Sequence, residues 1–272
     1  MHIRISHDTI YRYAQPVSGV IQTLRLTPRN HDGQYVTAWR IDISVDCPLA
    51  GHVDAFGNLT HTFTADGPLD ELTVHVEGNV DVEDNNGLVK GTIERFPPSL
   101  FLRETPLRQP DDAIRDFAAL FSGGDRLTLL HDMLITLHRE MAFDTDPTHT
   151  ATTAAEAFAL KRGVCQDISH IFISALRSRS IPARYVSGYF YRGDGVVAQE
   201  AGHAWTEAYV PDLGWVAFDP TNGISATDAH LRVAVGLDYL SAAPVRGTRF
   251  GGSGEDLEVR IRVDQARHQG QD

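Results

Sequence analysis

The sequence GVCQD at residues 163–167 determines how the second half of the chain folds. Gly163 ends a short helix predicted over 154–161, and the apolar residues that follow at helical spacing predict a new helix that begins at Cys165. That helix ends before Pro182, because the residue that precedes a proline avoids helical geometry. A cysteine in the first turn of a helix lies beside unpaired backbone N–H groups and the positive end of the helix dipole, and both favour the thiolate.

Cys165 is therefore a candidate nucleophile, since the thiolate and not the thiol attacks a carbonyl carbon. Its position alone also fits a small buried residue, which is what most free cysteines are. Cys47, the other of the two cysteines, fits that second interpretation better because it precedes Pro48 at the end of a predicted strand. Two isolated cysteines provide no framework of disulfide bridges, which is typical of a cytosolic protein.

Two strands are predicted downstream of this helix, one that contains His203 and one that ends at Asp219. The short connection between them favours a hairpin, which makes the two strands neighbours in a sheet. An even register would set Asp219 opposite Thr206 and so on the face of the sheet away from His203. We therefore predict an odd-length loop or a bulge, with Gly214 in the left-handed conformation, that shifts the register by one residue.

These three residue types together can carry acyl transfer. Cys165 would supply the nucleophile, and His203 would hold it as an ion pair and later give a proton to the leaving amine. Asp219 would fix the tautomer and the orientation of the imidazole through its other nitrogen. The oxyanion would fall near the backbone N–H of Cys165. Gln166 and the indole of Trp205 are candidates for a second oxyanion or substrate contact, and either fits packing equally well.

The chain divides by pattern into four segments. Residues 1–96 show alternating apolar and polar residues between turn sequences, which predicts an N-terminal antiparallel β-sandwich. Residues 97–110 contain four prolines and little periodicity, and they are predicted to be a linker. Residues 111–264 begin with helical spacing and continue with strands, which predicts an α+β domain of helices packed on an antiparallel sheet. Residues 265–272 are expected to be a tail, and the fold class of the whole chain is α+β.

Two details of this division depend on local pattern alone. Asp66-Gly67-Pro68 is interpreted as a turn between two strands of the first domain. The alternating apolar residues between 257 and 263 are interpreted as the last strand of the catalytic domain.

The balance of charge excludes several classes of partner. Lys and Arg number 24 against 36 Asp and Glu, so the formal net charge is −12. A phosphate-binding surface needs the opposite sign, and we expect neither nucleic acid nor membrane as a partner. The N-terminus alternates like a strand rather than a signal peptide, and a cytoplasmic protein is expected. No residues with metal-ligand spacing are evident, so we expect neither a metal nor a cofactor.

Several motifs, taken in order, resemble the bacterial transglutaminase-like superfamily. They are GVCQD at 163–167, IPARYVSGY at 181–189, HAW at 203–205, WVAFDPTN at 215–222 and HLRVAVG at 230–236. LRLTPR at 24–29 and FGN at 56–58 are similar to the β domain that accompanies this family's core. The resemblance covers nearly the whole chain. It implies a papain-like transglutaminase core over residues 111–264 and a Cys-His-Asp triad at Cys165, His203 and Asp219.

The predicted function is a cysteine-dependent acyl-transfer enzyme that acts on amide bonds of a protein or peptide through a thioester intermediate. Water as the acceptor would give a protease or amidase, and an amine would give a transglutaminase. The sequence does not choose between them, because the exclusion of water from the pocket decides the outcome. Prokaryotic relatives are often described as proteases, which favours hydrolysis. The alternative is a non-catalytic binding or scaffolding module on the same fold, and the oligomeric state is left open.

Overall fold

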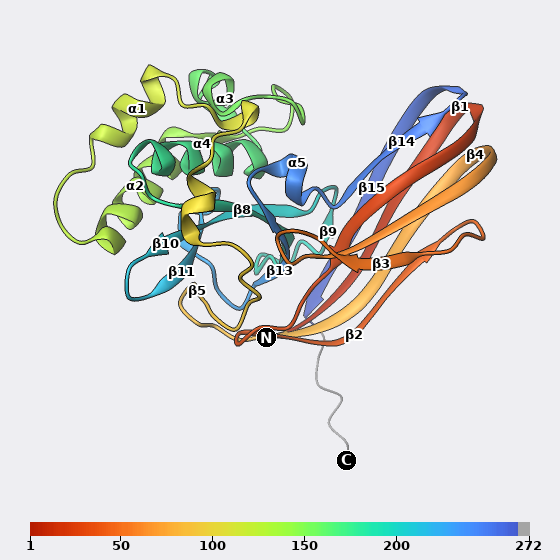
Figure 1. The fold of residues 1–272 in the computed structure, drawn as a ribbon, viewed down its shortest axis with the longest axis horizontal. Helices are drawn as coiled ribbons and strands as arrows, with labels where there is room; N and C mark the ends of the chain where they lie inside the picture. Colours follow the sequence, from red (N-terminus) through yellow and green to blue (C-terminus); the bar gives the residue numbers. More distant parts are fainter. Residues whose placement is uncertain (266–272) are drawn as a thin grey trace, which may run out of the picture.

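The computed structural model describes residues 1–265 of the 272-residue chain and has two parts (Figure 1). Long antiparallel strands form the β-rich part at the right of Figure 1, and helices packed on a second sheet form the helical part. This arrangement confirms the α+β fold class. None of the helices within residues 1–265 combines the length and the apolar character needed to cross a lipid bilayer.

The β-rich part is a seven-stranded sheet in the order β2-β4-β1-β15-β9, with β14 paired to β1 and β3 paired to β4. Its strands are β1 (His2–Thr27), β2 (Gln34–Ile43), β3 (Ala50–Val53), β4 (Leu59–Val82), β9 (Ala198–Gln199), β14 (Val245–Phe250) and β15 (Ser253–Gln265). Every pairing between them is antiparallel. Apolar side chains of β1 and β4, among them Leu24, Phe63 and Leu72, form a core of their own.

Two strands of the β-rich part are far longer than the short strands expected from the sequence. β1 has 26 residues and β4 has 24. Asp66-Gly67-Pro68, expected to be a turn, lies within β4, where the pairing with β1 shifts register between Val17 and Gly19. A bulge of this kind lets a strand continue through residues that break a regular ladder. Gly67 fits there because an added Cβ atom would lie 2.1 Å from the carbonyl oxygen of Val17.

The end of the chain differs from the expected domain boundary. β14 and β15 both pair with β1, so residues 245–265 belong to the β-rich part and not to the catalytic core predicted over 111–264. Alternating apolar and polar residues predict that a strand exists, but they do not indicate which strand it pairs with. Ile261 and Val263 are buried in the core that the two parts share. The tail predicted over 265–272 lies, after its first residue, outside the described residues.

The helical part contains a six-stranded sheet in the order β12-β11-β10-β8-β13, with β5 paired to β11. Its strands are β5 (Leu88–Val89), β8 (Ala183–Phe190), β10 (His203–Val210), β11 (Gly214–Asp219), β12 (Ile224–Ser225) and β13 (His230–Gly236). A separate short pair consists of β6 (Ala142–Phe143) and β7 (Arg162–Gly163). The helices are α1 (Asp112–Ala119), α2 (Arg126–Glu140), α3 (Ala154–Leu160), α4 (Cys165–Ser178) and α5 (Tyr239–Ala242).

The segment predicted as a linker, 97–110, is partly packed into the protein. It contains two 3-10 turns, Pro98–Leu102 and Pro106–Arg108, and it buries Phe101 and Leu107. Proline interrupts regular hydrogen bonding but does not prevent burial of its neighbours. Because β5 already pairs with β11, the chain reaches the second sheet before this segment begins.

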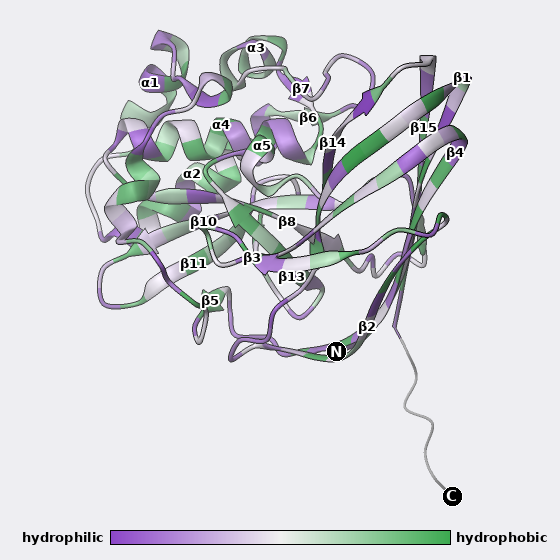
Figure 2. Ribbon diagram, turned by 45° about the vertical axis from the view of Figure 1, so that its right-hand side comes forward, coloured by the Kyte–Doolittle hydropathy of each residue, from purple (hydrophilic) through white to green (hydrophobic). Residues whose placement is uncertain are grey.

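Helix α4 is the central element of the helical part. Every residue from Gln166 to Arg177 is buried. Figure 2 shows apolar residues concentrated between the helices and the second sheet, whereas the strands of the β-rich part alternate between apolar and polar residues. A helix that is enclosed on all sides has little freedom to move, so α4 holds its first residue, Cys165, in a defined place.

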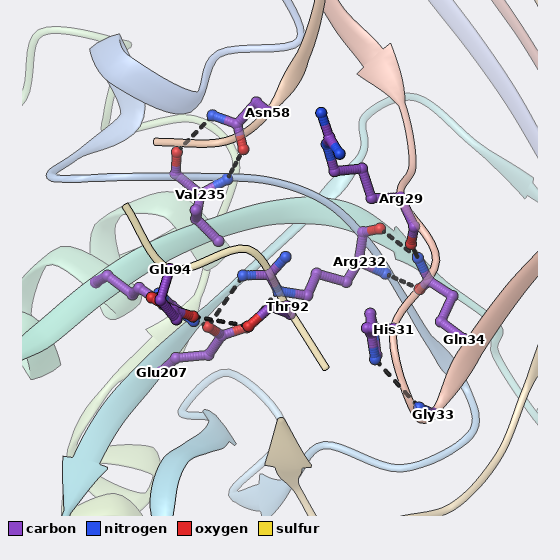
Figure 3. A network of polar contacts seen from close by, with 11 residues as sticks. Arg29, His31, Gly33, Gln34, Asn58, Thr92, Glu94, Glu207, Arg232 and Val235 are labelled. Atoms are coloured by element: carbon purple, nitrogen blue, oxygen red, sulfur yellow. Dashed lines mark hydrogen bonds and ion pairs between the residues drawn. The ribbon is translucent and has the colours of Figure 1, made fainter. Parts of the chain in front are cut away.

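A buried ion network stabilises the second sheet (Figure 3). The carboxylate of Glu207 on β10 accepts hydrogen bonds from Nε of Arg184 at 2.6 Å and from Nε of Arg232 at 2.7 Å. Arg184 also binds Glu94 at 2.8 Å, which fastens the segment after β5 to the sheet. Burial alone would raise the pKa of Glu207, but Arg232 and Arg184 outweigh burial and lower that pKa from 4.5 to about 2.

Replacing Glu207 with alanine should lower the free energy of unfolding by about 3–5 kcal/mol, because two guanidinium groups lose their shared buried partner. Chemical denaturation at neutral pH measures this change. Since the pKa of Glu207 is lowered on folding, its contribution in the wild-type protein should be complete above pH 4.5 and lost as the pH falls towards about 2. Glu77→Ala, which breaks an exposed pair with Arg4, is the control and should change little. Equal losses in the two variants would contradict this prediction.

Candidate active site

The thiol of Cys165 lies at a well-defined helix start. Cys165 is the first residue of α4 and follows Val164, whose backbone is extended. The carboxylate of Asp167 accepts hydrogen bonds from the backbone N–H of Val164 at 2.9 Å and from the hydroxyl of Thr148 at 2.7 Å. Asp167 therefore fixes the turn that leads into Cys165, as the acidic residue of a capping box does.

The hairpin of β10 and β11 places Asp219 on the same face of the sheet as His203. Thr206 pairs with Phe218 rather than with Asp219, which is the shift of one residue predicted from the sequence. Gly214 has a φ of 90°, so the predicted left-handed glycine after the loop is also confirmed. Side chains alternate between faces along a strand, and this register sets the imidazole and the carboxylate side by side.

His203 and Asp219 form a buried ion pair. The distance between His203 Nε2 and Asp219 Oδ2 is 2.7 Å, and the side chains are 11% and 0% exposed. Burial alone would lower the pKa of His203, but Asp219 and Cys165 outweigh burial and raise that pKa from 6.5 to about 10. Burial likewise opposes the charge of Asp219, yet His203 and His230 hold the pKa of this carboxyl well below its usual value. The imidazole is therefore positively charged at neutral pH.

The sulfur of Cys165 lies beside the same imidazole. A hydrogen bond between the side chains of Cys165 and His203 contributes to the raised pKa of His203. Asp219 occupies Nε2, so Nδ1 is the nitrogen left for the sulfur. The sulfur also lies 4.0 Å from the carbonyl oxygen of Gly202, the residue before β10. The structure thus brings together the three side chains that were named from the sequence.

Asp219 accepts further hydrogen bonds that the sequence analysis missed. Its Oδ1 accepts from the backbone N–H groups of Thr221 at 3.0 Å and of Asn222 at 3.2 Å. Its Oδ2 accepts from the side-chain amide of Asn222 at 2.6 Å and from Nε2 of His230 at 3.1 Å. An aspartate that binds backbone groups two and three residues later is a turn pattern that the sequence could have revealed. His230 begins another strand, and no local pattern links it to Asp219.

The two residues considered as oxyanion or substrate contacts are placed differently. The side chain of Gln166 donates to the carbonyl oxygen of Thr150 at 3.4 Å. Trp205 is 1% exposed and stacks on His203, with ring centroids 6.1 Å apart and an interplanar angle of 30°. Trp205 therefore shields one side of the imidazole from solvent. A role for either residue at the oxyanion stays a prediction.

The cluster of His203, Asp219 and His230 also has the composition of a metal site. Within residues 1–265 it is the one group of three such side chains whose candidate ligand atoms all lie within 4.8 Å of one another. The backbone N–H of Thr227 donates to Nδ1 of His230 at 3.1 Å, so the ring proton is on Nε2, the nitrogen that faces Asp219. A metal ligand needs a lone pair at that nitrogen. The hydrogen bonds therefore favour a proton-mediated network over metal coordination.

Comparison with known proteins defines the class of this fold. A solved structure from Cytophaga hutchinsonii, described as a candidate cysteine protease, has a TM-score of 0.79 and covers 100% of this chain and 92% of that chain at 18% identity. The likeness shows a shared fold, in which helices packed on an antiparallel sheet accompany a β-rich part. Residues 125–220 match the Transglutaminase-like superfamily, and residues 3–81 match the Bacterial transglutaminase-like N-terminal region. The chain therefore contains a transglutaminase-like core preceded by the N-terminal region of bacterial transglutaminase-like proteins.

Relatives in other bacteria differ in how much of the chain they share. An uncharacterized protein of Mycobacterium leprae is 28% identical over 278 residues, which cover 96% of this chain and 98% of that protein. A protein-glutamine gamma-glutamyltransferase of Pseudomonas aeruginosa is 29% identical over 149 residues, which cover 48% of this chain but 21% of that protein. The similarity to the first relative thus extends over both parts of the fold.

Replacing Asp219 with asparagine should destabilise the protein most where both partners of the ion pair are charged. On folding, the pKa of Asp219 falls below 3.8 and that of His203 rises from 6.5 to about 10. The contribution of the pair to the free energy of unfolding should be complete between pH 3.8 and 6.5 and should be lost as the pH rises towards about 10. It should also be lost as the pH falls below that window.

Chemical denaturation of the wild-type protein and the Asp219→Asn variant across this pH range measures the difference in unfolding free energy. Asp8→Asn, at a partly exposed pair with His75, is a matched control and should show a smaller difference. A difference between wild type and Asp219→Asn that does not vary with pH would contradict the assigned charges.

Proposed function

We propose that this protein is a cysteine-dependent acyl-transfer enzyme that acts on amide bonds of proteins or peptides. The position of a charged imidazole between a thiol at a helix start and a buried carboxylate is the observation that supports this function best. In this proposal Cys165 is the nucleophile, His203 stabilises its thiolate and transfers protons, and Asp219 holds the imidazole.

The reaction proceeds through a thioester. The thiolate of Cys165 attacks the amide carbonyl carbon, and the negative charge that develops on the oxygen faces the unpaired backbone N–H groups at the start of α4. His203 then donates a proton to the leaving amine as the C–N bond breaks, which leaves an acyl group on the sulfur and a neutral imidazole. The acceptor attacks the carbonyl carbon of this thioester and gives its proton to His203 as the C–S bond breaks, so the product leaves and the thiolate–imidazolium pair of the free enzyme is restored.

The acceptor distinguishes hydrolysis from amine transfer, because the same three residues serve both. The Pseudomonas relative is named as a glutamyltransferase and the Cytophaga structure as a candidate protease. In this chain the side chain of His203 is 11% exposed, and Cys165 is partly exposed. Solvent therefore reaches the side chains of Cys165 and His203. Because water at the thioester favours its hydrolysis, hydrolysis is the proposed outcome.

Iodoacetamide should alkylate Cys165 faster than Cys47 at mildly acidic pH. The imidazolium of His203 stabilises the anion of Cys165, whereas burial, together with the charge of Asp46, raises the pKa of the Cys47 thiol. Mass spectrometry of the digested protein over time gives both rates from one sample, so Cys47 serves as an internal control. His203→Phe should slow the modification of Cys165 and leave that of Cys47 unchanged. Equal rates in the wild-type protein would rule out an activated thiol.

Incubation with a library of peptides that contain side-chain and backbone amides should produce an acyl adduct on Cys165. Intact-protein mass spectrometry detects the adduct in the wild-type protein and in the Cys47→Ala variant, and Cys165→Ala should show none. Adding a small primary amine reveals the acceptor, because hydrolysis yields free acid and amine transfer yields a new amide. An adduct that persists in Cys165→Ala would place the chemistry elsewhere, and no adduct with any amide would support a binding module.

A further inference from the structure

His230 is a second histidine on the carboxylate of Asp219. It is the first residue of β13, and its side chain is 1% exposed. Its Nε2 lies 3.1 Å from Asp219 Oδ2, the same oxygen that binds His203 at 2.7 Å. A single carboxylate oxygen is therefore shared by two imidazole rings that come from different strands.

The backbone fixes the tautomer of His230. The N–H of Thr227 can only donate, and it lies 3.1 Å from Nδ1 of His230, so this nitrogen is the acceptor. The ring proton is consequently on Nε2 and points at Asp219. Because an imidazolium has protons on both nitrogens, this geometry requires a neutral ring. His203 and His230 thus hold the same carboxylate in different ways, one as a cation and one as a neutral donor.

Aromatic rings hold the His230 side chain in this orientation. Its ring centroid is 4.7 Å from that of Phe190 and 5.3 Å from that of Trp205, with interplanar angles of 52° and 78°. Trp205 also stacks on His203, so one indole sets the position of both imidazoles. The ring has little freedom to leave Asp219, and rotation about its bonds would break the contact with Thr227.

Two charged groups near His230, Glu207 and Arg232, are paired with each other. Both residues line a small cavity together with His230, Glu83 and His31. Glu207 binds Arg184 and Arg232, and burial with the nearby charge of Arg232 lowers the pKa of His31 to about 4. The carboxylate of Asp219 is thus the one that His230 binds within the described residues.

We propose that His230 is a positioning residue, whose neutral Nε2–H holds Asp219 in the single orientation that directs His203 at Cys165. This role rests on the proposed function and adds to it. Without His230, Asp219 keeps the backbone N–H groups of Thr221 and Asn222, the amide of Asn222 and the imidazolium of His203, but it loses its donor from β13 and can tilt towards the space that the ring leaves. The imidazole would follow that tilt, and small displacements of a reacting group cost large factors in rate.

The tautomer can be tested without any substitution. ¹⁵N NMR of the wild-type protein should show His230 as a neutral ring with its proton on Nε2 at neutral pH. A proton on Nδ1, or on both nitrogens, would overturn the proposal, since His230 could then not act as the neutral donor described above.

Two variants at position 230 separate hydrogen bonding from packing. His230→Phe keeps a ring but has no donor, and it should slow alkylation of Cys165 by iodoacetamide by about tenfold to a hundredfold. It should also change how the rate of that alkylation depends on pH between about pH 5 and pH 8. His230→Gln has an amide that can reach Asp219 from a similar position, and it should recover most of the rate. His7→Phe is a matched control, because His7 is a buried histidine bonded to Tyr189 and Thr9 instead.

The outcomes separate this proposal from the proposed function. If Cys165 of the wild-type protein reacts no faster than Cys47, the proposed function itself fails. If Cys165 is activated in the wild-type protein and folded His230→Phe shows the same rate and pH profile, the positioning role fails and the proposed function stands. An equal loss of rate in His7→Phe and His230→Phe would also overturn it, because the effect would then reflect stability.

Discussion

The buried charge of Asp219 is the constraint on which the rest of the site depends. Removing a carboxylate from water costs several kcal/mol unless hydrogen bonds and an opposite charge replace the solvent. Asp219 is 0% exposed, and it is compensated by the imidazolium of His203, the neutral ring of His230 and three donors from the loop at Thr221 and Asn222. The donors come from β10, from β13 and from the loop after β11, so the charge is tolerated only when these strands are correctly paired. The same requirement makes the imidazole a cation beside the sulfur of Cys165.

The β-rich part holds the strands that carry this site. Gln34 of β2 binds both backbone groups of Arg232 on β13 at 2.9 and 2.8 Å. The connection from β8 to β10 contains β9, which pairs with β15, so the segment that ends at Gly202 is fastened to the first sheet. The two parts therefore share a core, and the positions of the imidazoles depend on both.

Local sequence patterns were sufficient for the elements that carry Cys165, His203 and Asp219, because each element is defined by neighbours in the chain. The helix start at Cys165 follows from a glycine and an apolar period, and the register at Gly214 follows from the parity that His203 and Asp219 must satisfy. Long-range pairing was beyond such patterns. The alternation in β15 does not say that its partner is β1, and the turn sequence at residues 66–68 does not reveal the bulge that continues β4. His230 meets Asp219 across the sheet, since two strands, β10 and β8, separate β13 from β11.

The protonation state of the His203 ring in the wild-type protein tests the central claim most directly. At about pH 8, which lies between the ordinary pKa of 6.5 and the raised value of about 10, ¹⁵N NMR should show protons on both ring nitrogens. The His203→Gln variant identifies the signals. A neutral ring at that pH, with a single ring proton, would contradict the account, since Asp219 would then not hold an imidazolium beside Cys165.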